Sequence, residues 1–403
     1  MKKLLFLNLY LLFTLCIANG QLSKIWSFKT EGQIFASVVT DVDKAYVGSG
    51  DGVFYAIDKT TGVPEWTYQT AGTKFSTALL MDDLICFGSN DGNLYALNKE
   101  DGSVVWQHHS KGEKEQDMWD YYLSSPIRYK GVIYWGCGDS YVYAISPKDG
   151  SEVWKYKTEG IVHATPVMQD EKLLIGSFDG FLYALNAESG KLEWRFNTLG
   201  AHYFPNGAIQ KAVLVNDGIV YFGSRDYNLY ALEATSGRVL WNYREPHGWI
   251  IATPILFKEH LYFGCSDGHQ FCCMNAETGI MKWTLPLTMR VFGEAVPVND
   301  KMVFGSHNGI LYLVDASEGT VLDQFRTEGH IENYSEVYSV TGSFKEGFEL
   351  YGSDMLGTEQ KILNLGSILS TPTIEEDRIY FGSADGHIYS VHYSGKAAPG
   401  KIK

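Results

Sequence analysis

A segment with a glycine-rich signature recurs along the whole chain and constrains the fold more than any other feature. GSGDGVFYAIDKTTGVPEW at 48–66 and GSFDGFLYALNAESGKLEW at 176–194 are two of its eight copies. The first glycines stand at positions 48, 88, 136, 176, 223, 264, 305 and 382, so the spacing is close to 40 residues with three longer intervals. A period of this size, with several short strands per repeat, is typical of a β-propeller with one blade per repeat.

The glycine-rich signature itself could be mistaken for a phosphate-binding loop. Such a loop is followed by a helix whose N-terminal amides face the anion. Here GSGDG is followed by VFYAI, whose β-branched and aromatic residues favour a strand. We therefore interpret the signature as a connection between strands and exclude a nucleotide site.

Each repeat contains four candidate strands, which in the fourth copy are 162–168, 172–177, 181–186 and 191–196. Between the second and third strands most copies carry an Asp-Gly pair, as at 51–52, which predicts a tight type I′ hairpin. Asp139-Ser140 and Asp226-Tyr227 replace this pair in two copies. The sequence therefore predicts altered hairpins in those two blades.

Seven tryptophans are predicted to dock each blade on its neighbour. They are Trp26, Trp66, Trp106, Trp154, Trp194, Trp241 and Trp283. The last copy stops after its third strand, so segment 22–30, which contains Trp26, is expected to complete that blade. The predicted fold is an all-β, eight-bladed β-propeller of four-stranded blades, closed by pairing of the N-terminal strand with the C-terminal blade.

The longest interval between signatures, from Gly305 to Gly382, departs from the repeat. It could contain a ninth blade, but it lacks the xDGxxYAxD and TGxxxW elements. We interpret 326–364 as an insertion in a propeller of residues 21–403, and SEVYSVTG and FELYGS predict that this insertion is rich in strands.

The first residues indicate export. Lys2 and Lys3 precede a short apolar run and the sequence Ala18-Asn19-Gly20, which together predict a signal peptide at 1–20. Leu15 stands where a lipoprotein signal needs a small residue before Cys16, so cleavage without lipidation is expected and the protein would be periplasmic or secreted. Removal of this segment takes the formal charge from −14 to −16, which argues against a nucleic-acid partner. No later segment approaches the ~20 apolar residues of a transmembrane helix.

AIDKTTGVPEW, ALNKEDGSVVW and ALNAESGKLEW resemble the AxDxxTGxxxW tryptophan-docking motif of the pyrroloquinoline-quinone (PQQ) repeat family. The resemblance covers nearly all of the chain after residue 20 and implies an eight-bladed propeller. The family includes dehydrogenases that carry PQQ and Ca²⁺ on the propeller axis. It also includes non-enzymatic members similar to the periplasmic lipoprotein of outer-membrane β-barrel assembly. The length of this chain favours the second branch, because the resemblance implies large additional insertions in the dehydrogenases.

One cysteine pair points toward the dehydrogenase branch. Cys272-Cys273 resembles the adjacent-cysteine disulfide that covers PQQ in several of those enzymes. In the repeat, however, FCCMN occupies the register of LYALN within a third strand, where cysteines serve as small apolar residues. We therefore expect no cofactor and no metal, with PQQ and Ca²⁺ as the alternative.

Two features suggest a binding site on one face. The connection from each outer strand to the next inner strand places rings and charges around the mouth of the axis, and three of these connections are long, at 110–121, 199–211 and 326–364. The candidate binding residues are Phe35, Lys74, Trp119, Tyr121, Tyr122, His163, Tyr203, Trp249, Arg290 and Glu294. The open alternatives are a water-filled channel without a ligand and loops that have drifted without selection.

These observations predict a monomeric, non-enzymatic scaffold that binds a protein or glycan partner through one face and assists outer-membrane protein assembly. The competing hypothesis is an enzyme. It would be either a PQQ- and Ca²⁺-dependent dehydrogenase or a polysaccharide-acting propeller that uses His163, Tyr203 and Arg290.

Overall fold

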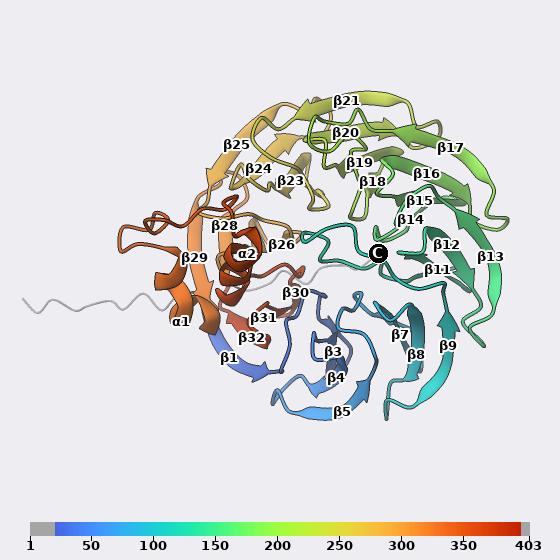
Figure 1. The fold of residues 1–403 in the computed structure, drawn as a ribbon, viewed down its shortest axis with the longest axis horizontal. Coiled ribbons are helices and arrows are strands. Elements are labelled where there is room, and N and C mark those ends of the chain that lie inside the picture. The colour runs from blue at the N-terminus through green and yellow to red at the C-terminus, as the bar shows by residue number, and fades with distance from the viewer. Residues whose placement is uncertain (1–20, 396–403) are drawn as a thin grey trace, which may run out of the picture.

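A computed structural model describes residues 21–395, and the predicted signal peptide at 1–20 lies outside the described residues. The chain forms eight four-stranded antiparallel sheets arranged around one axis (Figure 1). Each sheet is one blade, and in the first seven blades the strand nearest the axis comes first in the chain, whereas in the last blade the N-terminal strand is outermost. The prediction of an all-β, eight-bladed propeller is confirmed.

The blades are numbered here in chain order. Blade 1 contains β2 (Val39–Thr40), β3 (Lys44–Gly48), β4 (Val53–Asp58) and β5 (Pro64–Gln69), and blade 2 contains β6 (Leu79–Leu80), β7 (Leu84–Ser89), β8 (Asn93–Asn98) and β9 (Val104–His109). Blade 3 contains β10 (Ile127–Tyr129), β11 (Val132–Cys137), β12 (Tyr141–Ile145) and β13 (Glu152–Lys157), and blade 4 contains β14 (Val167–Gln169), β15 (Lys172–Gly176), β16 (Phe181–Asn186) and β17 (Leu192–Asn197).

The second half of the ring follows the same pattern. Blade 5 contains β18 (Leu214–Asn216), β19 (Ile219–Gly223), β20 (Asn228–Glu233) and β21 (Val239–Arg244), and blade 6 contains β22 (Ile255–Phe257), β23 (His260–Gly264), β24 (Gln270–Asn275) and β25 (Met281–Pro286). Blade 7 contains β26 (Val296–Val298), β27 (Lys301–Gly305), β28 (Ile310–Asp315) and β29 (Val321–Arg326), and blade 8 contains β30 (Thr373–Glu375), β31 (Arg378–Gly382), β32 (His387–Tyr393) and β1 (Leu22–Lys29).

Blade 8 joins the two ends of the described chain. β1 pairs antiparallel with β32, from Leu22 opposite Tyr393 to Lys29 opposite His387. The N-terminal strand therefore supplies the outer strand that the last repeat lacks, and the predicted closure is confirmed.

The tryptophans dock each blade on the next one through one repeated contact. The Trp154 indole N–H of blade 3 donates to the Ala187 carbonyl of blade 4 at 2.8 Å. A Cβ added to Gly190, in the turn after β16, would lie 2.7 Å from the same indole ring. The glycine that precedes each tryptophan is thus required because the ring of the preceding blade packs flat against its Cα. The same ring-to-glycine contact joins Trp26 to Gly62, Trp66 to Gly102, Trp106 to Gly150, Trp194 to Gly237, Trp241 to Gly279 and Trp283 to Gly319.

The seventh blade has Asp323 where the others have tryptophan, and the closure explains the change. Blade 8 has no turn between its third and fourth strands, because these come from opposite ends of the chain. No glycine turn is therefore available to receive a ring. The Asp323 carboxylate instead accepts the Leu22 N–H of β1 at 2.8 Å and fastens the closing strand to blade 7.

The hairpins between second and third strands are not the predicted type I′ turns. In the hairpin between β3 and β4 only Gly52 has positive φ, the Gly52 N–H donates to the Ser49 carbonyl, and the Ser49 N–H donates to the Val53 carbonyl. This is a type I turn followed by one left-handed residue. Asp51 is required because its carboxylate accepts both the Val53 N–H and the Tyr55 hydroxyl proton.

The prediction of altered hairpins at Asp139-Ser140 and Asp226-Tyr227 is also wrong. Ser140 and Tyr227 take the left-handed position with φ of 71° and 72°, and the neighbouring hydrogen bonds are kept. The hairpin that differs from the others is that of blade 6, between β23 and β24, although it contains an Asp-Gly pair. One extra residue shifts the left-handed position to His269, and a cysteine takes the place of the aspartate-bonded tyrosine.

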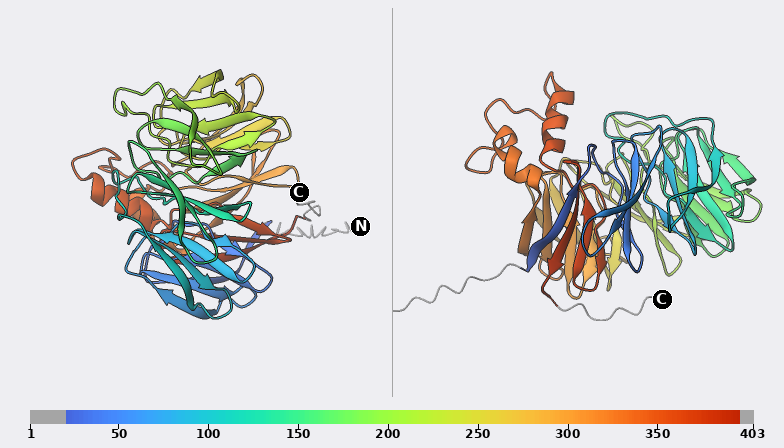
Figure 2. Two further views of the ribbon diagram at one scale, coloured as in Figure 1. Left: turned by 90° about the vertical axis from the view of Figure 1, so that its right-hand side faces the viewer. Right: turned by 90° about the horizontal axis from the view of Figure 1, so that it is seen from below.

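The insertion is helical, so the prediction of strands at 326–364 is wrong. α1 (Glu328–Val337) is capped by Thr327, whose side chain accepts the His330 N–H. α2 (Met355–Asn364) is capped by Asp354, whose side chain accepts the Gly357 N–H. The apolar residues that suggested strands pack on one another: Val337 and Tyr338 meet Ile362 of α2 and Met289 of the connection between β25 and β26. Both helices project from one face of the ring (Figure 2).

Candidate functional site: a sealed axis and the cavity beneath it

The long connections predicted at 110–121, 199–211 and 326–364 gather on one end of the propeller, which we call the loop face. Together they bury a cluster of apolar side chains at the mouth of the axis, which we call the aromatic plug. Its members are Tyr121, Tyr122, Trp249, Ile251, Phe292, Leu363, Leu369 and Ala384, with Phe35, Trp119, Phe204 and Tyr227 packed against them. The mouth of the axis is therefore filled by the protein's own side chains.

His163 holds the first loop of the plug in place. Its Nδ1 lies 2.9 Å from Asp120 Oδ1 and its Nε2 lies 3.0 Å from Glu113 Oε2, and all three side chains are buried. Burial lowers the pKa of His163, but the Asp120 charge and the hydrogen bonds to both carboxylates raise it by more, to about 9. The ring is thus an imidazolium between two carboxylates, and it is a clamp rather than a free catalytic base.

This clamp predicts a pH dependence of stability. The folded pKa of His163 is about 9 and the ordinary value is 6.5. A group with a raised folded pKa stabilises the fold fully below its unfolded pKa and loses that contribution as the pH rises through the folded pKa. We expect the free energy of unfolding to fall by on the order of 3 kcal/mol between pH 6.5 and pH 9.5. Urea unfolding followed by tryptophan fluorescence measures this, and a flat profile over that range would contradict the charged clamp.

Two further cations fasten the same loop. Lys74 Nζ donates to the Asp120 carbonyl at 2.7 Å and lies 2.9 Å from a Glu115 carboxylate oxygen. Arg225 pairs with Asp117, and its guanidinium carbon lies 4.6 Å from the centre of the Trp249 ring. Three cationic side chains, Lys74, His163 and Arg225, therefore hold the connection 110–121 in position.

Arg290 fastens the helical insertion in the same way. Its Nη1 lies 2.8 Å from Glu359 Oε2 of α2, and both side chains are buried. The Tyr121 hydroxyl donates to the other Glu359 oxygen at 2.6 Å. Arg290 also contacts Tyr351 and Asp267, which hydrogen-bond to each other. This network joins blade 6, the first loop and α2 into one surface.

The candidate residues therefore separate into four groups, and Phe35 and Trp119 pack against the plug. Lys74, His163 and Arg290 hold loops, and Tyr121, Tyr122 and Trp249 are buried in the plug. Tyr203, in the connection 199–211, is 76% exposed and is not a member of the plug. Glu294 faces a cavity below the plug.

Sequence reasoning missed several partners, namely Glu113, Asp117, Asp120, Lys211, Arg225 and Glu359. A signal for Arg225 was present in the repeat. The third residue of the GSxDG signature varies among the copies and, in several blades, faces the mouth, where Arg225 and His307 stand. The acidic partners had no such signal, because each lies in a connection that occurs once.

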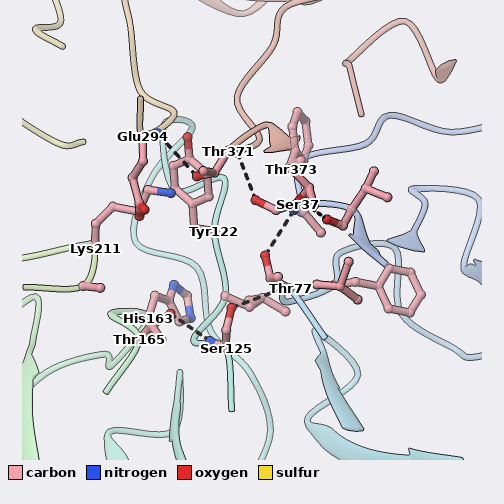
Figure 3. A pocket seen from close by; sticks show the side chains of 17 residues that line it. Ser37, Thr77, Tyr122, Ser125, His163, Thr165, Lys211, Glu294, Thr371 and Thr373 are labelled. Atoms are coloured by element: carbon pink, nitrogen blue, oxygen red, sulfur yellow. Dashed lines mark hydrogen bonds between the residues drawn. The ribbon is translucent and has the colours of Figure 1, made fainter. Parts of the chain in front are cut away.

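A cavity of about 340 Å³ lies on the axis beneath the plug (Figure 3). The residues that line it come from the inner strands and the connections leading into them. They are Phe35, Ala36, Ser37, Val38, Val39, Phe75, Thr77, Tyr122, Leu123, Ser125, His163, Thr165, Lys211, Ala212, Glu294, Thr371 and Thr373. Hydroxyl groups dominate its polar side chains, with one histidine, one lysine and one glutamate. Its volume is at the small end of the ~300–1,000 Å³ of ligand sites.

The residues of the axis do not fit PQQ with Ca²⁺. Cys272 and Cys273 are buried on opposite sides of β24, in the cores toward blades 5 and 7 respectively, so they cannot cover a ligand on the axis. The plug occupies the mouth. Among residues 21–395, no group of three His, Cys, Asp or Glu side chains is placed to hold a metal ion.

Neither of the two helices in the described chain is long and apolar enough to cross a membrane.

Solved structures with the same fold come from both branches of the family. BamB from Moraxella catarrhalis is 17% identical, with a TM-score of 0.68, over 94% of this chain and 99% of that one. Quinohemoprotein alcohol dehydrogenase from Comamonas testosteroni is 13% identical, with a TM-score of 0.69, over 95% of this chain and 78% of that one. A europium-containing methanol dehydrogenase is 12% identical, with a TM-score of 0.70, over 93% of each chain. We expected the dehydrogenases to be longer than this chain, but the share of each chain covered does not separate BamB from the dehydrogenases.

A family model described as outer membrane protein assembly factor BamB matches residues 18–136, 138–248 and 205–344. No curated protein matches the sequence significantly. The matched ranges cover most of the chain and carry the docking motifs that the structure places between blades. The chain belongs to the PQQ-like repeat propellers represented by the outer membrane protein assembly factor BamB.

Proposed function

We propose that this protein is an exported, non-enzymatic scaffold that binds a protein partner through its loop face and assists outer-membrane protein assembly. The observation that carries the proposal is that the charged side chains at the mouth of the axis pair with the protein's own loops. Lys74, His163 and Arg290 all bind residues of the long connections, so these side chains stabilise a rigid surface and do not form a reactive site.

That surface exposes large apolar side chains above the plug. Leu199 and Tyr203 from one connection are 71% and 76% exposed, and Leu356 at the start of α2 is 72% exposed. Tyr351 is half exposed and contacts Trp119 of the first loop at a ring-centroid distance of 6.4 Å. Rigid exposed aromatic and aliphatic side chains are typical anchors of protein interfaces.

The family supports the assembly role and the location. The predicted signal peptide would export the chain, and the matching family model is described as an outer membrane protein assembly factor. A periplasmic protein with an apolar, preformed face has the property that such a role needs, because binding costs little ordering of the scaffold.

The test is photo-crosslinking in the native envelope with a photoreactive residue at Leu356 or at Val42. Val42 is 83% exposed in the turn between β2 and β3, at the opposite end of the propeller, and serves as the matched control. We expect a protein adduct from position 356 and none from position 42. Adducts from both positions, or from neither, would argue against a partner on the loop face, and an adduct containing saccharide would identify a glycan partner instead.

The dehydrogenase alternative has a direct assay. Adding PQQ and Ca²⁺ to the purified chain should give no alcohol- or sugar-dependent dye reduction, because the plug closes the mouth and the vicinal cysteines lie in the cores between blades. Turnover that depends on PQQ would contradict the scaffold proposal.

A further inference from the structure

The cavity beneath the plug carries a belt of hydroxyl groups from five blades. Each hydroxyl oxygen accepts a backbone N–H from the preceding blade, at 2.9–3.4 Å. The belt consists of Ser37, Thr77, Ser125, Thr165 and Thr371. Among residues 21–395 no acceptor lies within hydrogen-bonding distance of their own hydroxyl protons. A hydroxyl that has accepted an N–H keeps its proton for a second bond, so the belt offers several O–H donors to the cavity.

Three blades depart from the belt. Blade 6 keeps a hydroxyl at this position, Thr253, but among the described residues its oxygen has no hydrogen-bond partner, and it does not line the cavity. The other two departures introduce charge. In blade 7 the belt position is Glu294, and in blade 5 it is Ala212, which follows Lys211. The position of Lys211 holds small residues in other blades, Ala36, Ala164, Gly293 and Ser370. A lysine in a position built for alanine is not required by packing between blades.

The ammonium of Lys211 has no ionic or hydrogen-bonding partner among the described side chains. Its Nζ lies over the face of Tyr122, 3.7 Å from the ring centre. Burial lowers the pKa of Lys211, and the Glu294 carboxylate only partly offsets this. Both charged groups line the cavity (Figure 3), yet they form no ion pair within 4.0 Å. An ammonium held in this way gains most from a carboxylate brought by a ligand.

The cavity also has an apolar wall. Phe35, Val38, Phe75 and Leu123 line it beside the belt. A ligand that satisfies the whole lining thus carries one carboxylate for Lys211 and the hydroxyl protons, one cationic donor for Glu294, and a short apolar group. These are the three parts of an apolar α-amino acid.

We propose that the axial cavity binds a small zwitterion of the amino-acid type, with its carboxylate on Lys211 and the hydroxyl belt and its ammonium on Glu294. This site is separate from the loop face and does not depend on the partner proposed there. The belt residues are half-buried, so solvent reaches the cavity, whereas the plug above it is closed.

The test uses three probes that differ by one charged group: leucine, 4-methylpentanoate, which lacks the ammonium, and 3-methylbutylamine, which lacks the carboxylate. Isothermal titration with the purified chain should show leucine binding more tightly than either single-charge probe. Loss of one charge-assisted contact should weaken binding by about tenfold or more. Absence of leucine binding at millimolar concentration, or equal binding of all three probes, would overturn the proposal.

Two variants separate the roles of the charges. Lys211→Ala restores the residue that other blades carry, so the fold should be kept while binding of leucine and 4-methylpentanoate is lost. Glu294→Thr restores the belt hydroxyl and should bind 4-methylpentanoate at least as tightly as leucine. Lys258→Ala, in the turn between β22 and β23 at an exposed ion pair with Asp300, is the control and should leave all three titrations unchanged. Unchanged leucine affinity in Lys211→Ala would reject the site even if crosslinking on the loop face succeeds.

Discussion

Replacing His163 by leucine is expected to lower the free energy of unfolding by about 3–5 kcal/mol, because two buried carboxylates then lose the cation between them. His163 contacts Asp120 at 2.9 Å and Glu113 at 3.0 Å, and the three side chains are almost completely buried. Leucine fills a similar volume but supplies neither charge nor hydrogen bonds. Chemical unfolding at pH 6.5 measures the loss, and the variant should also lose the decline in stability that the wild-type chain shows toward pH 9.5.

A second substitution checks the cause of that loss. Adding Glu113→Gln to His163→Leu removes one of the two unpaired charges, so the double variant should recover part of the stability. His108→Leu is a suitable control, since burial lowers the pKa of His108 and no carboxylate contacts its ring. If the double variant is less stable than His163→Leu alone, the charge explanation is wrong and His163 acts through packing.

The second large effect is expected at the docking turns. Gly190 has φ of 67° and a Cβ there would lie 2.7 Å from the Trp154 ring, whereas Gly218 has φ of 75° and a Cβ there would meet nothing within 4 Å. Both alanine variants share the cost of a left-handed residue, about 1–2 kcal/mol. Gly190→Ala should lose about 1–3 kcal/mol more, because the indole must move away from its close-packed position.

The comparison between the two glycine variants isolates the contact between blades. Thermal unfolding of Gly190→Ala should occur at a lower temperature than that of Gly218→Ala, and the near-ultraviolet circular dichroism of the tryptophans should change only in the former. Equal destabilisation would mean that backbone strain alone explains the glycine, and the stacking account of the repeat would then fail.

The sequence allowed prediction of whatever occurs in several copies. The tryptophan and its glycine, the signature hairpin and the closing strand each appear at a fixed spacing, so copies such as Trp154 and Gly190 could be interpreted from the others. Even there the turn type was wrong, because spacing reveals which residue needs positive φ but not how Asp51 bonds to Val53 and Tyr55.

The candidate site was less predictable because its parts occur once. Glu113, Asp120 and Glu359 lie in connections with no counterpart in other blades, so nothing in the repeat announced the clamps on His163 and Arg290. The insertion was misread for a related reason: alternating apolar residues around Val337 and Tyr338 suggested strands, while the caps at Thr327 and Asp354 fixed helices. Lys211 could have been noticed as a charge in a column of small residues.

The closure of blade 8 also imposes an order of events in time. Among the described strands β1 is synthesised first, yet its hydrogen-bonded partner β32 is synthesised last. Leu22 therefore cannot pair with Tyr393 until nearly the whole chain has been made. Contacts between residues so distant in sequence form late and slowly during folding. Until synthesis is finished the ring stays an open arc, with the edge of blade 1 and the edge of the newest blade both unprotected. The protein is thus most exposed to misassembly just before its final strand emerges, and pairing of β32 with β1 converts the arc into a ring.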